Sequence, residues 1–563
     1  MVINLITVRL LDKHPYGLRI DCSRYRIEVK MLALILSIAI ANAGDIEEVE
    51  TYSEVESGMA AWGAYEAHFE SENMSEHALE HGREWSCGTT VVQGVRDNWD
   101  SFTAEQQARI TERLTPWKDD FMATMEPNPA PPMGNPATNT CFEVSRPSGT
   151  GQGLNRLDSE HFSVQWDDSL TQSTVQSFSD ALETSWDVEV DQMDWRAPDK
   201  TSMYLILVYI SNDNMGGAYT SIDRCGNDYT PYIVAGRDSF WGTWYQDMAA
   251  HEFNHAIQFA YGMANESWLW EATALWIEEY VFPSHNAWSD YITGYTKNPH
   301  LAINADNRNS NSEFLHMYGM GILNFYLDEY VGGPELIRDI WEYSSNENGF
   351  YSLWIGDALD SLGYDWDEAY EGFIAANTVM DYLEGGDMPT TKIEDKVTSF
   401  PASGGSSSSH EPEGYGQNYI RIKTTGANDA APNLLVNFVG DSSSDWLVEL
   451  VGTDGRTVVD TFVMPIGDTG IGELEFYRFG DYEYVWLVVS PLGNTSKSYS
   501  YEWEIDAVEG SGDLDTGDGG SDAVGGCGCS ASGDVPSALV SWSWMVLFGL
   551  VISRRRKANI EVS

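Results

Sequence analysis

The chain has 563 residues and carries 87 Asp and Glu against 31 Lys and Arg, which gives a formal net charge of −56. This charge excludes nucleic acid as a partner, because binding a polyanion requires a basic surface. Hydrophobic residues make up 42% of the chain, enough to build folded cores, and six Cys are too few for a disulfide-built scaffold. The length predicts about three or four domains.

Residues 1–43 are predicted to be a signal peptide. Residues 31–43 form a short apolar stretch that ends in the small-x-small pattern Ala41-Asn42-Ala43. The basic stretch before them is long for such a signal, so translation could also begin at Met31. We therefore expect the body of the protein to be exported.

Residues 535–553 are predicted to be a transmembrane helix, because they are apolar, uncharged and just long enough to cross a bilayer. The tail 554–563 opens with three Arg and one Lys, which places it in the cytoplasm and everything before the helix outside. An acidic, Gly-rich spacer at 509–534 precedes the helix and contains Cys527 and Cys529.

This order of Cys motif, apolar helix and Arg cluster resembles the tripartite sorting tails of myxobacterial-type surface proteins. The resemblance covers the last part of the chain only. It implies a sorting protease that acts near Cys527 or Cys529, with an ordinary single-pass anchor as the alternative. Both interpretations give a protein that is anchored at the cell surface or outer membrane, unless it is released to the medium.

Residues 44–140 read as an acidic helical segment that ends in a Pro-rich linker. Apolar residues recur at helical spacing within 60–69 and 104–117. Such a segment is either a pro-region that masks the site or a helical cap. Cys87 and Cys141 lie outside the cytoplasm in this scheme and could form a disulfide.

Residues 141–400 are predicted to form an α+β domain, because strands come first and helices follow. The expected elements are strands at 161–166 and 204–210, a helix at 170–188, edge or hairpin strands at 216–219 and 232–235, and helices from 241 to 383. Residues 411–508 read as a β-sandwich of short apolar runs separated by turn residues. The Ser-rich run 403–409 is predicted to link the two domains.

The strongest chemical motif is His251-Glu252-Phe253-Asn254-His255, an HExxH sequence within a predicted helix at 248–262. Two His at i and i+4 share one face of a helix, so both imidazoles can bind one zinc ion. Glu252 is adjacent and can accept a proton from a water bound to the metal. Two unpaired His on a buried helix would be costly, which favours a metal site over core histidines.

A second motif follows in the next predicted helix, where Trp268-Leu269-Trp270-Glu271 leads to Ala274 and Glu278. HExxH followed by such a W-L-x-E-x-x-A helix resembles the gluzincin metallopeptidases. The resemblance implies that Glu271 is the third zinc ligand and that Glu278 orients a ligand His. Residues 155–510 also bear a diffuse likeness to secreted bacterial metalloproteases with this kind of tail.

Gluzincins place a Tyr or His downstream to stabilise the oxyanion, and Tyr318 is the candidate here, with His316 as the alternative. The alternative is that both are core or rim residues. The substrate backbone is expected to pair with an edge strand, either at 216–219 or at 232–235.

Two other features carry less weight. His77-Ala78-Leu79-Glu80-His81 is the inverted zinc signature H-x-x-E-H, but it lies in a polar, acidic segment and reads as the end of a surface helix. Cys225 has no matching His and Asn signature, which argues against a nucleophilic role.

The sequence therefore predicts an exported zinc endopeptidase with one catalytic Zn²⁺ held by His251, His255 and Glu271, and with Glu252 as general base. Its partners would be a protein or peptide substrate and a membrane. The alternative is a surface adhesion or binding protein on a metalloprotease-like fold that no longer cleaves. A zinc hydrolase acting on bonds other than peptide bonds is a third option.

Overall fold

A computed structural model describes residues 59, 61–66, 88–114, 155–166, 170–202, 205–211, 217–225, 228–262, 266–305, 315–346, 354–427 and 431–509. The expected α+β class is confirmed by three sheets and the helices that accompany them. The predictions for 1–43, 77–81, Cys87, Cys141 and 510–563 fall outside the described residues. Within the described part of the chain, no helix combines the length and apolar character needed to cross a membrane.

The first sheet is mixed and has the strand order β1-β2-β3-β5-β4. Its strands are β1 (Asn155–Asp158), β2 (Phe162–Trp166), β3 (Ile206–Ser211), β4 (Ala218–Cys225) and β5 (Asp228–Gly236). β2, β3 and β5 run parallel, whereas β1 and β4 are antiparallel to their neighbours. β4 is an edge strand, and β5 pairs on both sides. Residues 232–235 are therefore not an edge strand, and the substrate strand predicted there is wrong.

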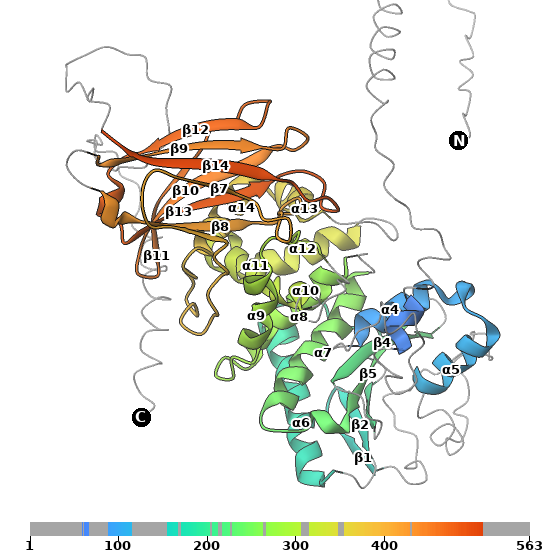
Figure 1. Cartoon of the computed structure of the whole chain (residues 1–563). Coiled ribbons are helices and arrows are strands. Elements are labelled where there is room, and N and C mark those ends of the chain that lie inside the picture. The colour runs from blue at the N-terminus through green and yellow to red at the C-terminus, as the bar shows by residue number, and fades with distance from the viewer. Residues whose placement is uncertain are drawn as a thin grey trace, which may run out of the picture. The chain divides into compact units, whose positions relative to one another are not determined.

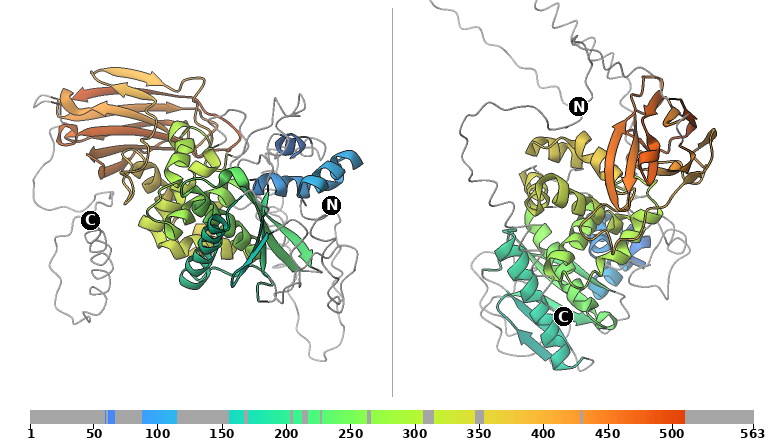
Figure 2. Two further views of the ribbon diagram at one scale, coloured as in Figure 1. Left: turned by 90° about the horizontal axis from the view of Figure 1, so that it is seen from below. Right: turned by 90° about the vertical axis from the view of Figure 1, so that its left-hand side faces the viewer.

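Two helices cover one face of this sheet (Figures 1 and 2). α6 (Gln172–Trp186) begins where the Thr171 hydroxyl accepts from the backbone N–H of Thr174 at 3.2 Å, and it buries Val175, Phe178 and Leu182 at helical spacing. It continues as a π-helical turn, Asp187–Gln192. α7 (Trp244–Tyr261) packs against β4, β5 and α6, and it ends at Gly262, which has a positive φ of 124°.

A group of helices follows α7 along the chain. They are α8 (Ser267–Val281), α9 (Trp288–Lys297), α10 (His316–Gly319), α11 (Gly321–Tyr326) with the π-helical turn Leu327–Gly332, α12 (Pro334–Asn346), α13 (Ile355–Leu362) and α14 (Trp366–Ala376). α9 and α10 approach so closely that a Cβ added at Gly294 would overlap the backbone of Leu315. α10 also packs against α8.

The C-terminal strands form two further sheets, with the orders β11-β10-β13-β8-β6 and β12-β9-β14-β7. Their bounds are β6 (Asp395–Val397), β7 (Ala402–Gly405), β8 (Asn418–Lys423), β9 (Asn433–Gly440), β10 (Trp446–Asp454), β11 (Thr457–Val463), β12 (Ile471–Phe476), β13 (Tyr484–Pro491) and β14 (Tyr501–Val508). Both sheets contribute side chains to one hydrophobic core. The predicted linker at 403–409 is partly wrong, because β7 pairs with β14.

A buried polar network joins the helices to the C-terminal strands. The hydroxyl of Tyr295 donates to Oε1 of Gln417 at 2.8 Å, lies 3.0 Å from the hydroxyl of Tyr419 and accepts from the Asn377 amide at 2.9 Å. Gln417 also donates to the Tyr370 hydroxyl. These groups satisfy one another where the helical and strand-built parts of the chain meet.

The described N-terminal residues are helical at 61–66, in α4 (Thr89–Asp97) and in α5 (Ala104–Leu114). α4 packs against β4, and Val91, Val92 and Val95 belong to the same core as the first sheet.

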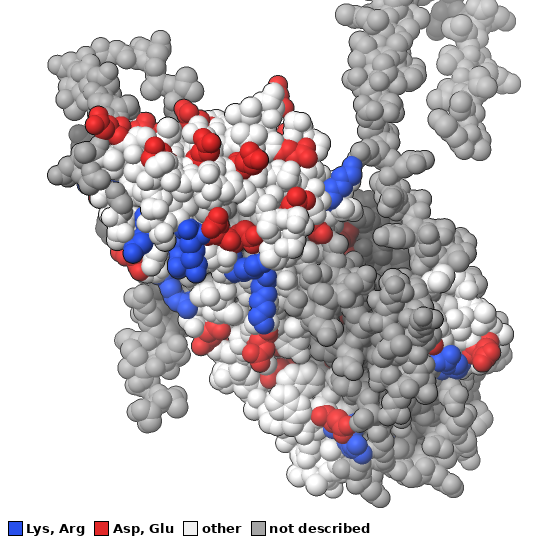
Figure 3. Space-filling view, viewed as in Figure 1, with Lys and Arg blue, Asp and Glu red and all other residues white. Residues whose placement is uncertain are grey.

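In Figure 3, acidic side chains are spread over the face that carries the C-terminal strands, and Lys and Arg side chains lie mainly below them.

Candidate metal centre

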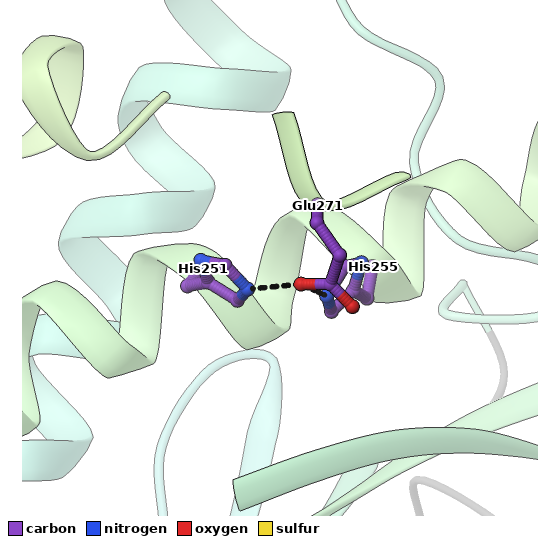
Figure 4. A group of neighbouring side chains, drawn as sticks. All are labelled: His251, His255 and Glu271. Atoms are coloured by element: carbon purple, nitrogen blue, oxygen red, sulfur yellow. Dashed lines mark hydrogen bonds and ion pairs between the residues drawn. The ribbon is translucent and has the colours of Figure 1, made fainter. Parts of the chain in front are cut away.

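α7 and α8 bring together the three residues expected to bind metal. His251 and His255 lie one turn apart on α7, and Glu271 lies in the first turns of α8, which packs against α7. His255 and Glu271 are fully buried and His251 is 7% exposed. Figure 4 shows the Glu271 carboxylate between the two imidazole rings.

One donor atom from each of these side chains faces a common point. The three atoms lie within 4.8 Å of one another. Nε2 of His251 is 3.2 Å and Nε2 of His255 is 3.6 Å from Oε2 of Glu271. Two imidazole nitrogens and one carboxylate at such distances could hold a metal ion.

The other ring nitrogen of each His is fixed by an acceptor. Nδ1 of His251 lies 2.9 Å from Oε1 of Glu278 on α8, and Nδ1 of His255 lies 2.8 Å from Oε1 of Gln258. Because these oxygens can accept, each Nδ1 can carry a hydrogen, and each Nε2 is then directed at the common point, where it can bind a metal once it carries no proton. Glu278 thus makes the contact that its predicted orienting role requires.

Gln258 was not predicted from the sequence. Its amide group donates to Oδ1 of Asn254 at 2.7 Å and to the backbone oxygen of Trp270 at 3.0 Å, which turns its carbonyl oxygen toward His255. The available signal was its position three residues after His255, on the same helix face.

The buried His and Glu side chains shift one another's pKa values. Burial alone would lower the pKa of His251, but its hydrogen bonds to Glu271 and Glu278 raise it to about 10. Burial alone would raise the pKa of Glu271, but the neighbouring His255 and His251 hold it at about 2. Burial raises the pKa of Glu278 to about 7. The centre therefore favours a bound positive charge beside Glu271.

Glu252 is held on the side of α7 that faces the first sheet. Its Oε2 accepts from the hydroxyl of Thr89 on α4 at 3.3 Å, and the hydroxyl of Thr220 on β4 lies 2.7 Å from Oε2 and 2.8 Å from the backbone oxygen of Glu252. All three side chains are buried. Neither Thr could be predicted as a site residue, because both are distant in sequence and belong to no motif.

A pocket opens beside His251 and Glu252. Its lining includes Trp244, Tyr291 and Tyr318. The ring of Tyr318 stacks at 6.2 Å, centroid to centroid, on the ring of His251. His316 does not line this pocket, and its ring lies 6.1 Å from that of Tyr295. Of the two candidate donors, the structure brings Tyr318 to the centre.

The residues present fit a metal. Oε1 of Glu271 is buried and has no hydrogen-bond partner among the described residues. This carboxylate therefore keeps a lone pair that a metal ion could use. The Nε2 atoms of both His face the same point as the carboxylate. His251 also lines the pocket, which offers space beside this ligand for a further ligand on the metal.

Cys225 ends β4, and its side chain is outside the described part of the structure.

No protein-family model and no curated protein matches the chain.

Proposed function

We propose that the protein is a zinc-dependent endopeptidase of the gluzincin type. The observation that carries this proposal is the convergence of His251, His255 and Glu271 through Nε2, Nε2 and a carboxylate, with Glu252 alongside. Two His and one Glu form a ligand set used by catalytic zinc sites, which keep a position open for water or substrate. We also propose that residues 141–400 adopt the gluzincin fold and that residues 411–508 form a β-sandwich.

A bound zinc ion would supply a Lewis acid for the scissile carbonyl and would acidify a bound water. Glu252 would take the proton from this water at its carboxylate and pass it to the leaving amine. Tyr318, stacked beside His251 on the pocket, would donate a hydrogen bond to the developing oxyanion. Glu278 and Gln258 would hold the two ligand rings in their tautomers.

The substrate would lie along β4. β4 is an edge strand, and the Thr220 hydroxyl connects it to Glu252 at 2.7 Å. An extended peptide that adds to this edge gains backbone hydrogen bonds and brings its carbonyl groups alongside α7. This arrangement favours a polypeptide as the substrate.

Glu252→Gln tests the proposal. The variant should bind zinc stoichiometrically and lose at least about a hundredfold of the hydrolysis of a quenched peptide, the usual contribution of a general base. Glu335→Gln, at an exposed position on α12, is the matched control and should keep full activity. A Glu252→Gln variant as active as the wild type would overturn the assignment, and purified protein that binds no zinc would favour the non-cleaving adhesion protein.

We also propose that the enzyme works outside the cytoplasm. The support is the sequence of residues 1–43 and 535–563, which resembles a signal peptide and a sorting tail. Intact-mass measurement of the protein purified from its native membrane or medium would locate both mature termini and test this.

A further inference from the structure

The outward-facing edge of β4 is occupied by the chain itself. The backbone N–H of Gly88 donates to the carbonyl oxygen of Ala218 at 2.7 Å, and the N–H of Thr220 donates to the hydroxyl of Thr89 at 2.8 Å. A peptide strand that adds to a sheet edge needs these same two backbone groups. Such a strand and the segment at Gly88 cannot bind at once.

The same segment also reaches the proposed general base. The Thr89 hydroxyl that accepts from Thr220 donates in turn to Oε2 of Glu252 at 3.3 Å. Thr89 is fully buried. The single hydrogen of the Thr220 hydroxyl is shared between Oε2 at 2.7 Å and the backbone oxygen of Glu252 at 2.8 Å, so Thr89 is the donor that the segment adds at Oε2.

α4 anchors the segment through an apolar face. Val91, Val92 and Val95 are buried, and α4 packs directly on β4. The backbone N–H of Val92 bonds to the oxygen of Gly88 at 2.9 Å, so the helix begins at the blocked edge. Displacement of α4 would therefore free the edge and Glu252 together.

We propose that residues 88–97 are an internal inhibitor, which occupies the peptide track on β4 and holds Glu252, and that release of this segment activates the enzyme. The proposal rests on the proposed endopeptidase function and identifies how that site is regulated. A substrate strand and the inhibitor would compete for the same backbone groups of Ala218 and Thr220.

Thr89→Val in the full, zinc-loaded chain is the first test. The substitution keeps the side-chain shape but removes the hydroxyl that joins Thr220 and Glu252. Hydrolysis of a quenched peptide should rise about tenfold, which is the effect of one hydrogen bond to a charged group. Ser101→Ala changes an exposed hydroxyl in the turn that follows the segment and should leave the rate unchanged. An unchanged or lower rate in folded Thr89→Val overturns the proposal.

Release of the segment is the second test, and it decides the matter if Thr89→Val does not fold. A site for a specific protease is inserted between residues 114 and 155 of the full chain, and hydrolysis is compared before and after the cut. A rise after the cut supports the proposal. Equal activity in the uncut and cut chains overturns the proposal and leaves the endopeptidase function standing.

Peptide binding separates failure of the inhibitor from failure of the enzyme. The affinity of zinc-loaded Glu252→Gln for a fluorescent extended peptide is compared with that of Glu252→Gln combined with Thr89→Val. About tenfold tighter binding in the double variant supports the inhibitor without any catalysis. Tighter binding with no hydrolysis by the cut wild type would overturn the endopeptidase function alone, and equal binding would overturn the inhibitor.

Discussion

At the scale of single residues, the proton on His251 would compete with a metal ion for the same imidazole. Its raised pKa of about 10 means that the metal-free site holds this proton throughout the neutral range, whereas a metal ligand must be neutral imidazole. Lowering the pH by one unit should therefore weaken zinc binding about tenfold, for one displaced proton. Competition with a chromophoric chelator between pH 6.5 and pH 8.5 would measure this slope, and an affinity independent of pH would contradict it.

The site residues differ in how far the sequence could predict them. His251 and His255 belong to one helix turn, so their relation is local and legible in the HExxH pattern. Glu271 and Glu278 required a family resemblance. Thr89 and Thr220 reach Glu252 from distant strands and helices, and no spacing rule connects residues that only tertiary packing brings together.

At the scale of elements, β10 carries a fully buried carboxyl group. Both side-chain oxygens of Glu449 lack a hydrogen-bond partner among the described residues, and burial, with a smaller effect from Glu371, raises its pKa well above 4.5. The folded protein keeps this proton where the unfolded chain loses it. Glu449 therefore costs stability as the pH rises from about 4.5 toward its folded pKa.

Glu449→Gln should remove this dependence. The variant should gain stability at pH 8 relative to wild type by about 1.4 kcal/mol for each unit by which folding raises the pKa, and much less at pH 5. Urea unfolding at both pH values measures the difference. Glu504→Gln, at an exposed position on β14, is the control. An equal effect at the two pH values would refute the assignment.

The strands also show what patterns can and cannot reveal. In β14, Tyr501, Trp503 and Ile505 point inward and alternate with exposed acidic residues, so its strand character is readable from the sequence. β7 consists of Ala, Ser and two Gly and is held by its pairing with β14. A strand stabilised by its partner rather than by its own side chains looks like a linker in sequence.

At the scale of the whole molecule, a bound metal should stabilise the fold that surrounds it. It would neutralise Glu271 and occupy the lone pairs of both His, and it binds only where α7 and α8 are packed together. Removing zinc by dialysis against a chelator should lower the free energy of unfolding by about 4 kcal/mol, for zinc at a thousand times its Kd.

Differential scanning calorimetry with and without added zinc would measure this loss as a lower Tm. Glu252→Gln should show the same zinc-dependent shift, because Glu252 is not a proposed ligand, whereas His255→Ala should show none. A Tm that does not respond to zinc in the wild type would mean that the buried His and Glu cluster is a structural network.

The network around Tyr295 has an evolutionary consequence. Gln417 and Tyr419, near the start of the C-terminal strands, bind buried hydroxyl groups of the preceding helices. A recombination event that removed these strands would take hydrogen-bond partners away from the buried hydroxyl groups of Tyr295 and Tyr370. The strands are thus poorly suited to exchange as a separate module, and lineages that keep the metal centre should inherit them with it.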